Sequence, residues 1–561
     1  MSAATSPSTE PVCHFDNIPD EIVQLIFSYT QPTALLRDIA LVNRRCKKLV
    51  EDPILWRRFV FSDFTYWNPK TNIKATPANG HDGWKDIYLS RLLIANVVKR
   101  SINDMIRQQH GRIQSAENIA KYGYLAKDAL LAEISCPDDD ENVLARRYHA
   151  TAVLDHIQRT IAIETWISIF KGHNISHIQA LNAFDLFILH SRKGDRQEVV
   201  QMINGLIDQI RTQVDMQSLT PRQKALAIQS YLKEHNLVNL RNTQTKDGSD
   251  YENIENNYLS LALQDPDHPS LPLISGVLYC YIASAFGLRA QLCNYPGHIY
   301  ARLQPEAGFN MDGTTKSDIN EPMFLDPWRG TPEVSLLQLQ QGLVAMGVPD
   351  PALFEQFLTE ASTASLVIRT SRNIIASVHA NRNDESFVNG MGRQAESAAP
   401  ASNFYADLDS AFYSALWANL ILRPHNGDSI DEIRFLPMLL DNFERCYSLD
   451  TPLLERIVIG DGTPQNPGLD IPRVDEFHLP GTLAELRSSD AEPRQPKRRD
   501  SSRTSDDVKY RVGQVFRHKR YAYWGIICGW DVECTQNSEW MQHNRIDSLS
   551  RGRRQSFYHV L

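Results

Sequence analysis

The sequence predicts a multidomain α+β protein, and three observations support this prediction. At 561 residues the chain is too long for one hydrophobic core, so roughly three to four folded units are expected. Apolar residues recur at helical spacing over most of the chain before residue 240. Residues 508–561 instead alternate short β-branched and aromatic runs with glycine and charged turns, which is typical of a small antiparallel β-barrel.

Composition and charge argue against several classes of protein, including those that bind nucleic acids or membranes through a basic surface and those held together by disulfides. The chain is 42% hydrophobic and 22% charged, and its net charge of -9 provides no overall basic field for nucleic acids or membranes. The eight cysteines include no CxxC pair, as expected of reduced thiols in the cytoplasm, the nucleus or both. We expect no disulfide scaffold, no metal site and no cofactor. Residues 1–13 lack the regions of a signal peptide and are expected to be a disordered leader.

Residues 271–288 test the expectation of a protein without a membrane span. They are 18 consecutive uncharged residues, the length at which a span becomes a candidate. The segment begins with Leu-Pro, contains Ser275, Gly276 and Ser284, and is followed closely by a strand-like segment. These features favour a buried core helix, so no membrane partner is expected.

Residues 14–60 predict a compact helical hook near the N-terminus. Pro19 opens a helix with acidic residues in its first turn, which suits the helix dipole. About forty residues cannot bury all of their apolar faces alone, so a partner is expected to cover part of this surface. The first helix carries one apolar stripe, Ile22, Leu25, Ile26 and Tyr29. A second helix carries another, Ile39, Val42, Cys46, Leu49 and Val50. The unit is closed by an aromatic plug, Pro53, Leu55 and Trp56.

This pattern resembles an F-box, a three-helix module. The resemblance implies docking on a Skp-type adaptor within a cullin-RING ubiquitin ligase, whereas the alternative is a helical hairpin packed on its own domain. Residues 44–47 depart from the family, because many F-boxes have a tryptophan there. The matching positions include Glu21 and Val42, and the candidate adaptor-binding residues are Ile18, Pro19, Ile22, Leu25, Ile26, Phe27, Leu55 and Trp56.

Two largely helical regions flank the centre of the chain. Residues 61–245 predict a helical scaffold, and within it Thr220 and Pro221 mark the N-cap and first position of a helix over 220–236. Residues 346–486 are also expected to be helical, interrupted by a mobile insertion at 381–402. Residues 487–507 predict a disordered linker, since apolar residues are nearly absent. Its basic run is interpreted as a solvated tether, with a nuclear-localisation signal as the alternative.

Residues 246–345 have the order of a catalytic α+β domain. A buried helix precedes one strand carrying His298, and Asp326 ends the next strand, close enough for the carboxylate to orient the imidazole. Such a site needs a thiolate at the start of the helix, where the dipole lowers its pKa. No cysteine lies near residues 271–274.

This segment resembles the transglutaminase-like domain of SirB-type proteins, which has a papain-like α+β fold. The resemblance places Pro272 where active transglutaminases have their cysteine, so His298 and Asp326 form a degenerate dyad. Cys280 is expected to be an inert core thiol, and Ser275 would need His298 within hydrogen-bond reach. Four aromatic residues are expected to line a groove beside the dyad or to belong to the core: Tyr258, Tyr295, Tyr300 and Trp328. The matching motifs are Asn257-Tyr258-Leu259, Leu271-Pro272, Gly287-Leu288, Pro296-Gly297-His298 and Asp326-Pro327.

Residues 508–561 resemble the YccV/HspQ-like domain, which is described as binding hemimethylated DNA. The family adds a strand after the Tyr-His-Val segment, so a chain ending at Leu561 predicts a truncated or open barrel. Residues 509–561 contain nine Lys and Arg against four acids, a net charge of +5. Protein recognition is the favoured role and DNA binding the alternative, because the chain as a whole is negative. The candidate contact residues are Arg517, His518, Lys519, Arg520, Tyr523 and Trp524.

Together these features predict a non-catalytic substrate-recognition subunit of a Skp-cullin-F-box E3 ubiquitin ligase. Its partners would be a Skp-type adaptor, a cullin and a protein substrate that the sequence does not identify. One alternative is a transglutaminase-like hydrolase that uses His298 and Asp326. The other is a DNA-binding protein that acts through the C-terminal barrel.

Overall fold

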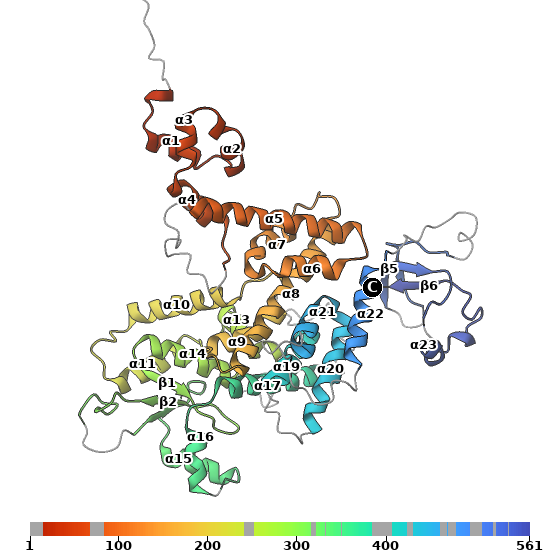
Figure 1. Ribbon diagram of the computed structural model, residues 1–561. Helices are drawn as coiled ribbons and strands as arrows, with labels where there is room; N and C mark the ends of the chain where they lie inside the picture. Colours follow the sequence, from red (N-terminus) through yellow and green to blue (C-terminus); the bar gives the residue numbers. More distant parts are fainter. Residues whose placement is uncertain are drawn as a thin grey trace, which may run out of the picture. The chain divides into compact units, whose positions relative to one another are not determined.

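Figure 1 shows the computed structural model of the chain, which divides into two compact units, residues 1–492 and 493–561. The leader at 1–13 and Arg520 lie outside the described residues. The structure describes residues 15–67, 83–240, 252–315, 321–330, 332–348, 350–383, 407–422, 430–460, 468, 478–493, 508–519, 523–536 and 538–560.

The N-terminal hook begins as predicted but contains more elements. Pro19 immediately precedes α1, and Asp20 and Glu21 occupy its first turn. The prediction of a single second helix over residues 39–50 is wrong. Asn43 has an extended backbone, and its side chain accepts the Cys46 N–H at 2.7 Å, so a new helix starts after it. The elements are η1 (Phe15–Asn17), α1 (Asp20–Phe27), α2 (Pro32–Arg37), η2 (Ile39–Leu41), α3 (Arg44–Val50) and α4 (Pro53–Asp63).

The core of the hook is completed by the next helix, α5 (Gly83–Arg107). Trp56 is fully buried and donates its indole N–H to the Val50 carbonyl at 2.6 Å. Trp84 and Tyr88 of α5 belong to the same cluster, and the rings of Trp56 and Tyr88 lie 5.4 Å apart. The hook and the start of the scaffold therefore share one apolar core.

The scaffold is helical, as predicted. Thr220 caps α11 by accepting the Gln223 N–H, Gln223 returns a bond to the Thr220 N–H, and Pro221 is the first helical residue. The elements after α5 are α6 (Arg112–Ala120), η3 (Gly123–Ala126), α7 (Lys127–Ile134), α8 (Val143–Phe170), α9 (His177–Ile188), α10 (Arg196–Gln213) and α11 (Pro221–Glu234).

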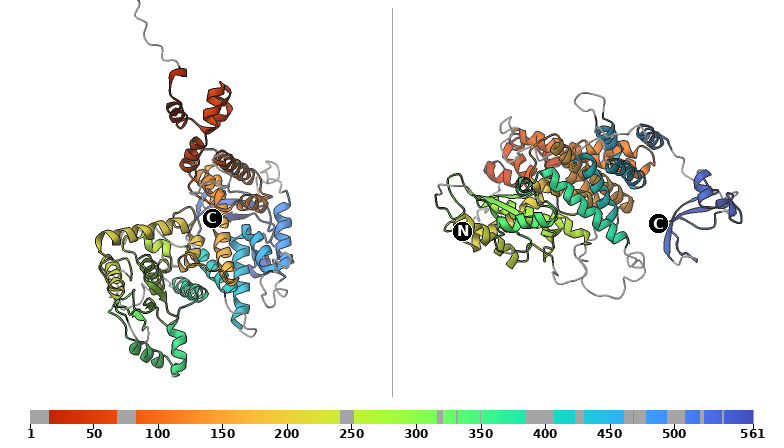
Figure 2. Two further views of the ribbon diagram at one scale, coloured as in Figure 1. Left: turned by 60° about the vertical axis from the view of Figure 1, so that its left-hand side comes forward. Right: turned by 90° about the horizontal axis from the view of Figure 1, so that it is seen from below.

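The central region combines a buried helix with a small antiparallel sheet, which can be followed in light green in Figures 1 and 2. The prediction of a core helix over 271–288 is confirmed, because nearly all of α14 is buried. A Cβ at Gly276 would lie 2.9 Å from Leu292 Cδ2, so glycine allows the helix to approach strand β1 closely. The elements are η4 (Ile254–Asn257), α13 (Leu259–Gln264), α14 (Pro272–Ala285), β1 (Arg289–Leu292), β2 (Ala301–Gln304) and β3 (Met323–Leu325), with strand order β1-β2-β3.

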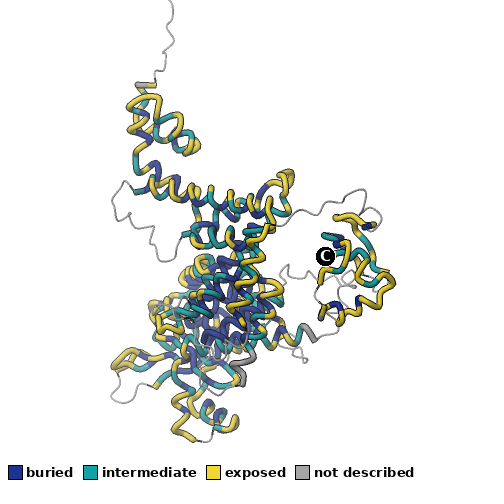
Figure 3. Tube along the Cα trace, turned by 45° about the vertical axis from the view of Figure 1, so that its right-hand side comes forward, coloured by how far each residue is buried: buried dark blue, intermediate teal, exposed yellow. Residues whose placement is uncertain are grey.

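The chain after the sheet is again mainly helical. Figure 3 shows how residues buried in the central helices gather into one large core, which α8, α9, α14, α17 and α19 share. Within the described ranges, no helix has the length and apolar character needed to cross a membrane. The elements are α15 (Leu336–Ala345), η5 (Pro351–Leu353), α16 (Phe354–Leu358), α17 (Thr363–Asn383), α19 (Leu408–Leu422), α20 (Ile430–Cys446), η6 (Ser448–Asp450), α21 (Thr451–Leu454), η7 (Glu455–Ile459) and α22 (Leu479–Ala491).

Two predicted boundaries change. Helix α22 continues to Ala491, five residues into the segment expected to be a disordered linker. Arg487 explains the difference, because its guanidinium pairs with Glu455 at 2.7 Å and with Glu117 at 3.0 Å. Helix α17 likewise continues to Asn383, inside the expected insertion. The remainder of that insertion, and the linker after residue 493, lie outside the described residues.

The C-terminal unit contains the predicted antiparallel strands. Their order is β4-β5-β6, so the described residues form an open three-stranded sheet with β4 and β6 at its edges. Arg517 pairs with Trp524 and Val515 with Ile526 across the first two strands. The elements are β4 (Val515–Arg517), β5 (Trp524–Asp531), α23 (Ser538–His543), η9 (Ile546–Ser548) and β6 (Phe557–Val560).

Candidate functional site

The hook exposes apolar side chains on the outer side of α1. Ile26 is 51% exposed, whereas Val23 and Phe27 on the other side of the helix are buried. Such side chains are usually covered when they gather on a small module. The most exposed apolar residues of the hook, called the docking surface below, are Ile22, Leu25, Ile26, Tyr29, Leu41, Val42 and Ile54.

The predicted adaptor-binding residues therefore divide into two groups. Pro19, like Ile22, Leu25 and Ile26, is exposed, and Ile18 is half-buried. Phe27, Leu55 and Trp56 are buried in the hook's own core. The prediction that these three side chains contact the adaptor is therefore corrected, because they pack inside the module and hold it together. Sequence reasoning missed Leu41 and Ile54, which are exposed beside residues that were singled out.

The stretch at 44–47 that departs from the F-box pattern has a structural role. The Arg45 guanidinium pairs with Asp20 at 2.7 Å and also donates to the Ile18 carbonyl. Cys46 is buried in the hook's core. These contacts fix the start of α1, the helix that carries Ile22, Leu25 and Ile26 of the docking surface.

The structure brings His298 and Asp326 together, as the sequence predicted. Their Nε2 and Oδ2 atoms are 2.8 Å apart, and the Asp326 carboxylate also accepts the Arg329 N–H at 3.0 Å. Asp326 directly follows β3, as expected. His298 lies in the turn before β2 rather than on a strand, because the Pro-Gly-His segment interrupts the pairing of β1 with β2.

Arg369 of α17 holds the turn that carries His298. Its guanidinium donates to the carbonyls of Tyr295 and His298, each at 2.9 Å. This double contact fixes the backbone on both sides of Gly297, which has a positive φ of 72°. No sequence signal identified Arg369, because it lies about seventy residues after the turn.

The four aromatic residues near the dyad have different environments. Tyr258 and Tyr295 are buried in the core, while Tyr300 and Trp328 are half-buried. The rings of Tyr300 and Trp328 lie 5.0 Å and 6.2 Å from the His298 ring. The Trp328 indole donates to the Ser270 carbonyl at 2.9 Å, so it connects the dyad with the residues that precede α14.

The start of α14 contains no available nucleophile. Pro272 is its first residue, so the helix starts where the sequence predicted. The Ser275 hydroxyl is buried, lies 2.6 Å from the Ser270 hydroxyl and accepts the Asn239 N–H. Burial raises the pKa of the Cys280 thiol well above its ordinary value, which makes thiolate chemistry unfavourable. Ser275 and Cys280, the two side chains near the start of α14 that were considered as nucleophiles, are thus both buried.

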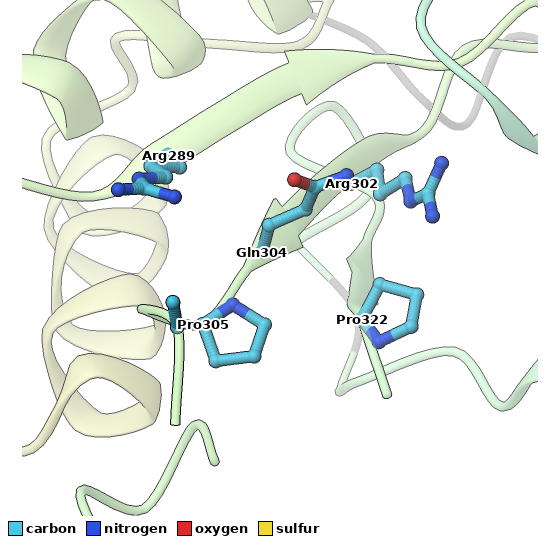
Figure 4. A pocket seen from close by; sticks show the side chains of 6 residues that line it. Arg289, Arg302, Gln304, Pro305 and Pro322 are labelled. Atoms are coloured by element: carbon cyan, nitrogen blue, oxygen red, sulfur yellow. The ribbon is translucent and has the colours of Figure 1, made fainter. Parts of the chain in front are cut away.

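A separate cavity of about 210 Å³ lies at the outer face of β1 and β2. Arg289 and Arg302 lie on either side of Gln304, with Pro305 and Pro322 nearby (Figure 4). His298 and Asp326 do not line it. The part of the chain that the structure describes also contains no group of three or more His, Cys, Asp or Glu side chains able to hold a metal ion.

The C-terminal candidates form an exposed basic and aromatic strip. Arg517, Lys519, Tyr523 and Trp524 are exposed, and the His518 ring stacks on Tyr523 at 4.9 Å. This arrangement could contact phosphates and bases, or a protein surface.

Comparison with protein families matches three segments of the chain. The F-box-like model matches residues 15–62, the transglutaminase-like superfamily model residues 197–372, and a model described as hemimethylated DNA-binding protein YccV like residues 508–561. The chain therefore combines an F-box-like, a transglutaminase-like and a YccV-like domain. These are the three families that the sequence motifs resemble. The transglutaminase-like match extends beyond the predicted segment of 246–345 at both ends.

Curated relatives match over a short stretch. F-box only protein 21 from Mus musculus is 46% identical over 55 residues, and the Homo sapiens and Pongo abelii proteins are each 44% identical over 55 residues. Each match covers 10% of this chain and 9% of the relative, so the chain spans about a tenth of their length in these matches. No solved structure matches the chain.

Proposed function

We propose that the chain is the substrate-recognition subunit of a Skp-cullin-F-box E3 ubiquitin ligase. The observation that carries this proposal is the exposed docking surface on an F-box-like domain, because an apolar surface of this kind requires a partner. The similarity to F-box only protein 21 supports it. The remaining domains would capture a protein substrate, and the ubiquitin transfer chemistry would belong to other subunits. Such a receptor would act in the cytoplasm, the nucleus or both.

Affinity purification of the full chain under proteasome inhibition tests this role. Wild-type chain should retain an adaptor, a cullin and ubiquitinated proteins. The Ile22→Asp, Ile26→Asp variant should lose the adaptor and cullin while keeping the captured substrate. A variant that retains both the adaptor and the cullin would contradict the proposal.

The transglutaminase-like domain is proposed to act without catalysis. Pro272 stands where a nucleophile would be needed, and Ser275 and Cys280 are both buried. His298 would then have no side chain to activate. The His298–Asp326 contact instead joins the turn before β2 to the end of β3.

Replacing His298 by alanine should leave substrate ubiquitination in the reconstituted complex unchanged, apart from a stability loss of about 1 kcal/mol from the lost hydrogen bond. Ubiquitination rate and denaturant midpoint would be measured together. His379→Ala is a matched control, because His379 lies on the exposed side of α17. A loss of activity at unchanged stability, or labelling of the domain by a serine-directed or thiol-directed probe, would favour the hydrolase alternative.

The YccV-like domain is proposed to recognise protein, with DNA as the second candidate. The exposed strip of Arg517, Lys519 and Trp524 favours DNA, whereas the chain's net charge of -9 opposes it. We expect the full chain to bind duplex DNA weakly, with binding lost by about 0.15 M salt and no preference for methylation state. Titration with hemimethylated and unmethylated duplexes at two salt concentrations checks this. Submicromolar, methylation-selective binding at the higher salt would establish the DNA role instead.

A further inference from the structure

Helix α15 is a surface helix with no charged residue in its ten positions, LLQLQQGLVA. Surface helices normally carry charged and polar residues on the side facing water. Here Leu337 is 62% exposed and Val344 is 51% exposed, seven positions apart on the same side of the helix. Met346, just after the helix, and Leu353 in η5 add further exposed apolar area. These four residues are called the α15 surface below.

The exposure is not caused by a poorly packed helix. Leu339 and Leu343, on the inner side, are fully buried in a cluster with Phe324 and Phe354. The Tyr295 hydroxyl donates to the Leu339 carbonyl at 3.0 Å, which ties α15 to the turn that carries His298. Helix α15 is therefore well packed on its inner side, and its exposed side carries Leu337 and Val344 with the uncharged Gln341 between them.

The α15 surface adjoins the candidate site. A Cβ built at Gly297 would lie 3.8 Å from the Met346 sulfur, so Met346 reaches the residue preceding His298. Tyr295, which bonds to α15, is also held by Arg369. The degenerate dyad and the α15 surface thus belong to one rigidly connected part of the transglutaminase-like domain.

The segment of the sequence that carries this surface has charges of a single sign. Residues 330–368 contain no lysine, arginine or histidine and four acids, Glu333, Asp350, Glu355 and Glu360. Glu333 is neutralised by Arg222. Asp350 and Glu355 are exposed, have no ion-pair partner among the described residues, and flank Leu353 in the sequence. A partner of complementary chemistry would carry apolar side chains beside basic ones.

We propose that the α15 surface docks a segment of the protein substrate in which apolar anchor residues lie next to lysine or arginine. The apolar anchors would cover Leu337, Val344 and Met346, and the basic residues would face Asp350 and Glu355. This inference rests on the proposed role as a substrate receptor, because it assigns the substrate-binding surface of that receptor.

The test uses the full chain with a displayed library of random peptides as the probe. Wild-type chain should enrich peptides that combine apolar and basic residues. The Leu337→Asp, Val344→Asp variant should lose this enrichment by about tenfold or more, because each aspartate would be desolvated beneath the peptide. Leu144→Asp is the matched control, since Leu144 is 78% exposed on α8 and should have no effect. Unchanged thermal melting would show that all variants are folded.

A charge exchange tests the second half of the proposal. Asp350→Lys, Glu355→Lys should weaken binding of an enriched basic peptide by about tenfold and strengthen binding of the same peptide with glutamate at its basic positions. Asp139→Lys, Glu141→Lys is the control, because both residues are exposed elsewhere. Enrichment of acidic peptides, enrichment that survives the α15 variant, or no enrichment would overturn the proposal. So would a wild-type dimer that the α15 variant converts to monomer, since a second copy would then cover the surface.

Failure of the docking inference and failure of the proposed function are distinguishable. Peptide binding is measured without adaptor, cullin or ubiquitin, and adaptor binding is measured separately. A chain that binds the adaptor but no peptide through α15 would retain the receptor role and lose this surface. A chain that binds such peptides but no adaptor would keep the surface and lose the ligase role.

Discussion

Replacing Ile22 and Ile26 together by aspartate should weaken binding of a Skp-type adaptor by more than about 100-fold without changing the fold. Both side chains are about half exposed on α1, so the free chain tolerates a charge there. In the complex each carboxylate would be buried against an apolar partner without a compensating cation. Titration calorimetry with purified adaptor, together with thermal melting of each variant, measures both parts of the expectation.

Two controls separate docking from folding. Leu93→Asp changes a residue that is 62% exposed on α5, outside the hook, and should leave adaptor binding intact. Val23→Asp places a charge at a fully buried position of α1 and should unfold the hook and lower the melting temperature. Undiminished binding by the Ile22, Ile26 double variant would refute the adaptor-binding role of the hook.

Asp450→Asn should destabilise the N-terminal unit by about 3–5 kcal/mol. Asp450 is fully buried, and its carboxylate accepts two bonds from the Arg159 guanidinium, each at 2.8 Å, while His156 Nδ1 lies 2.7 Å away. The amide cannot neutralise Arg159, which would remain as an unpaired charge inside the core. Denaturant unfolding of the variant measures the loss.

The comparison for this prediction is an exposed ion pair. Asp208→Asn removes the partner of Arg211 on the surface of α10 and should cost less than about 1 kcal/mol. A similar loss for both variants would contradict the argument from burial.

The buried pair also predicts a pH dependence. Although burial by itself opposes ionisation, the Arg159 charge and the hydrogen bonds lower the pKa of Asp450 below its ordinary value of 3.8. A carboxyl group with a lower pKa in the folded state stabilises the fold above pH 3.8, and this contribution is lost as the pH falls further. The acid limb of the wild-type stability profile should therefore be steeper than that of Asp450→Asn.

Features set by local sequence were predictable. Thr220 and Pro221 fixed the start of α11 because a capping box and a first-turn proline act within one helical turn. The uncharged run at 271–288 correctly indicated a core helix. The pairing of His298 with Asp326 was also predicted, since a helix followed by two antiparallel strands brings the ends of those strands together.

Features set by packing between distant segments were not predictable. Periodicity placed Ile22 in an apolar stripe, and the F-box resemblance added Phe27, but which of them faces the core depends on α3 and α5. Arg369 was missed because its partners are backbone carbonyls, which leave no pattern in the side-chain sequence. The linker was predicted to begin too early, because the ion pairs of Arg487 join residues more than thirty and three hundred positions away.

The shared core of the hook and α5 limits where the chain can be divided. A fragment ending at residue 60 would remove Trp84 and Tyr88 and uncover Trp56, Phe59 and the apolar side of α4. The smallest autonomous fragment that carries the docking surface should therefore extend into α5 at least through Tyr88. The later part of this helix packs in a different core, where Ile94 and Val98 are buried. Transplanting this F-box-like domain onto another protein would require carrying that helix with it. In evolutionary exchange, too, the inherited unit would be the hook together with its first scaffold helix.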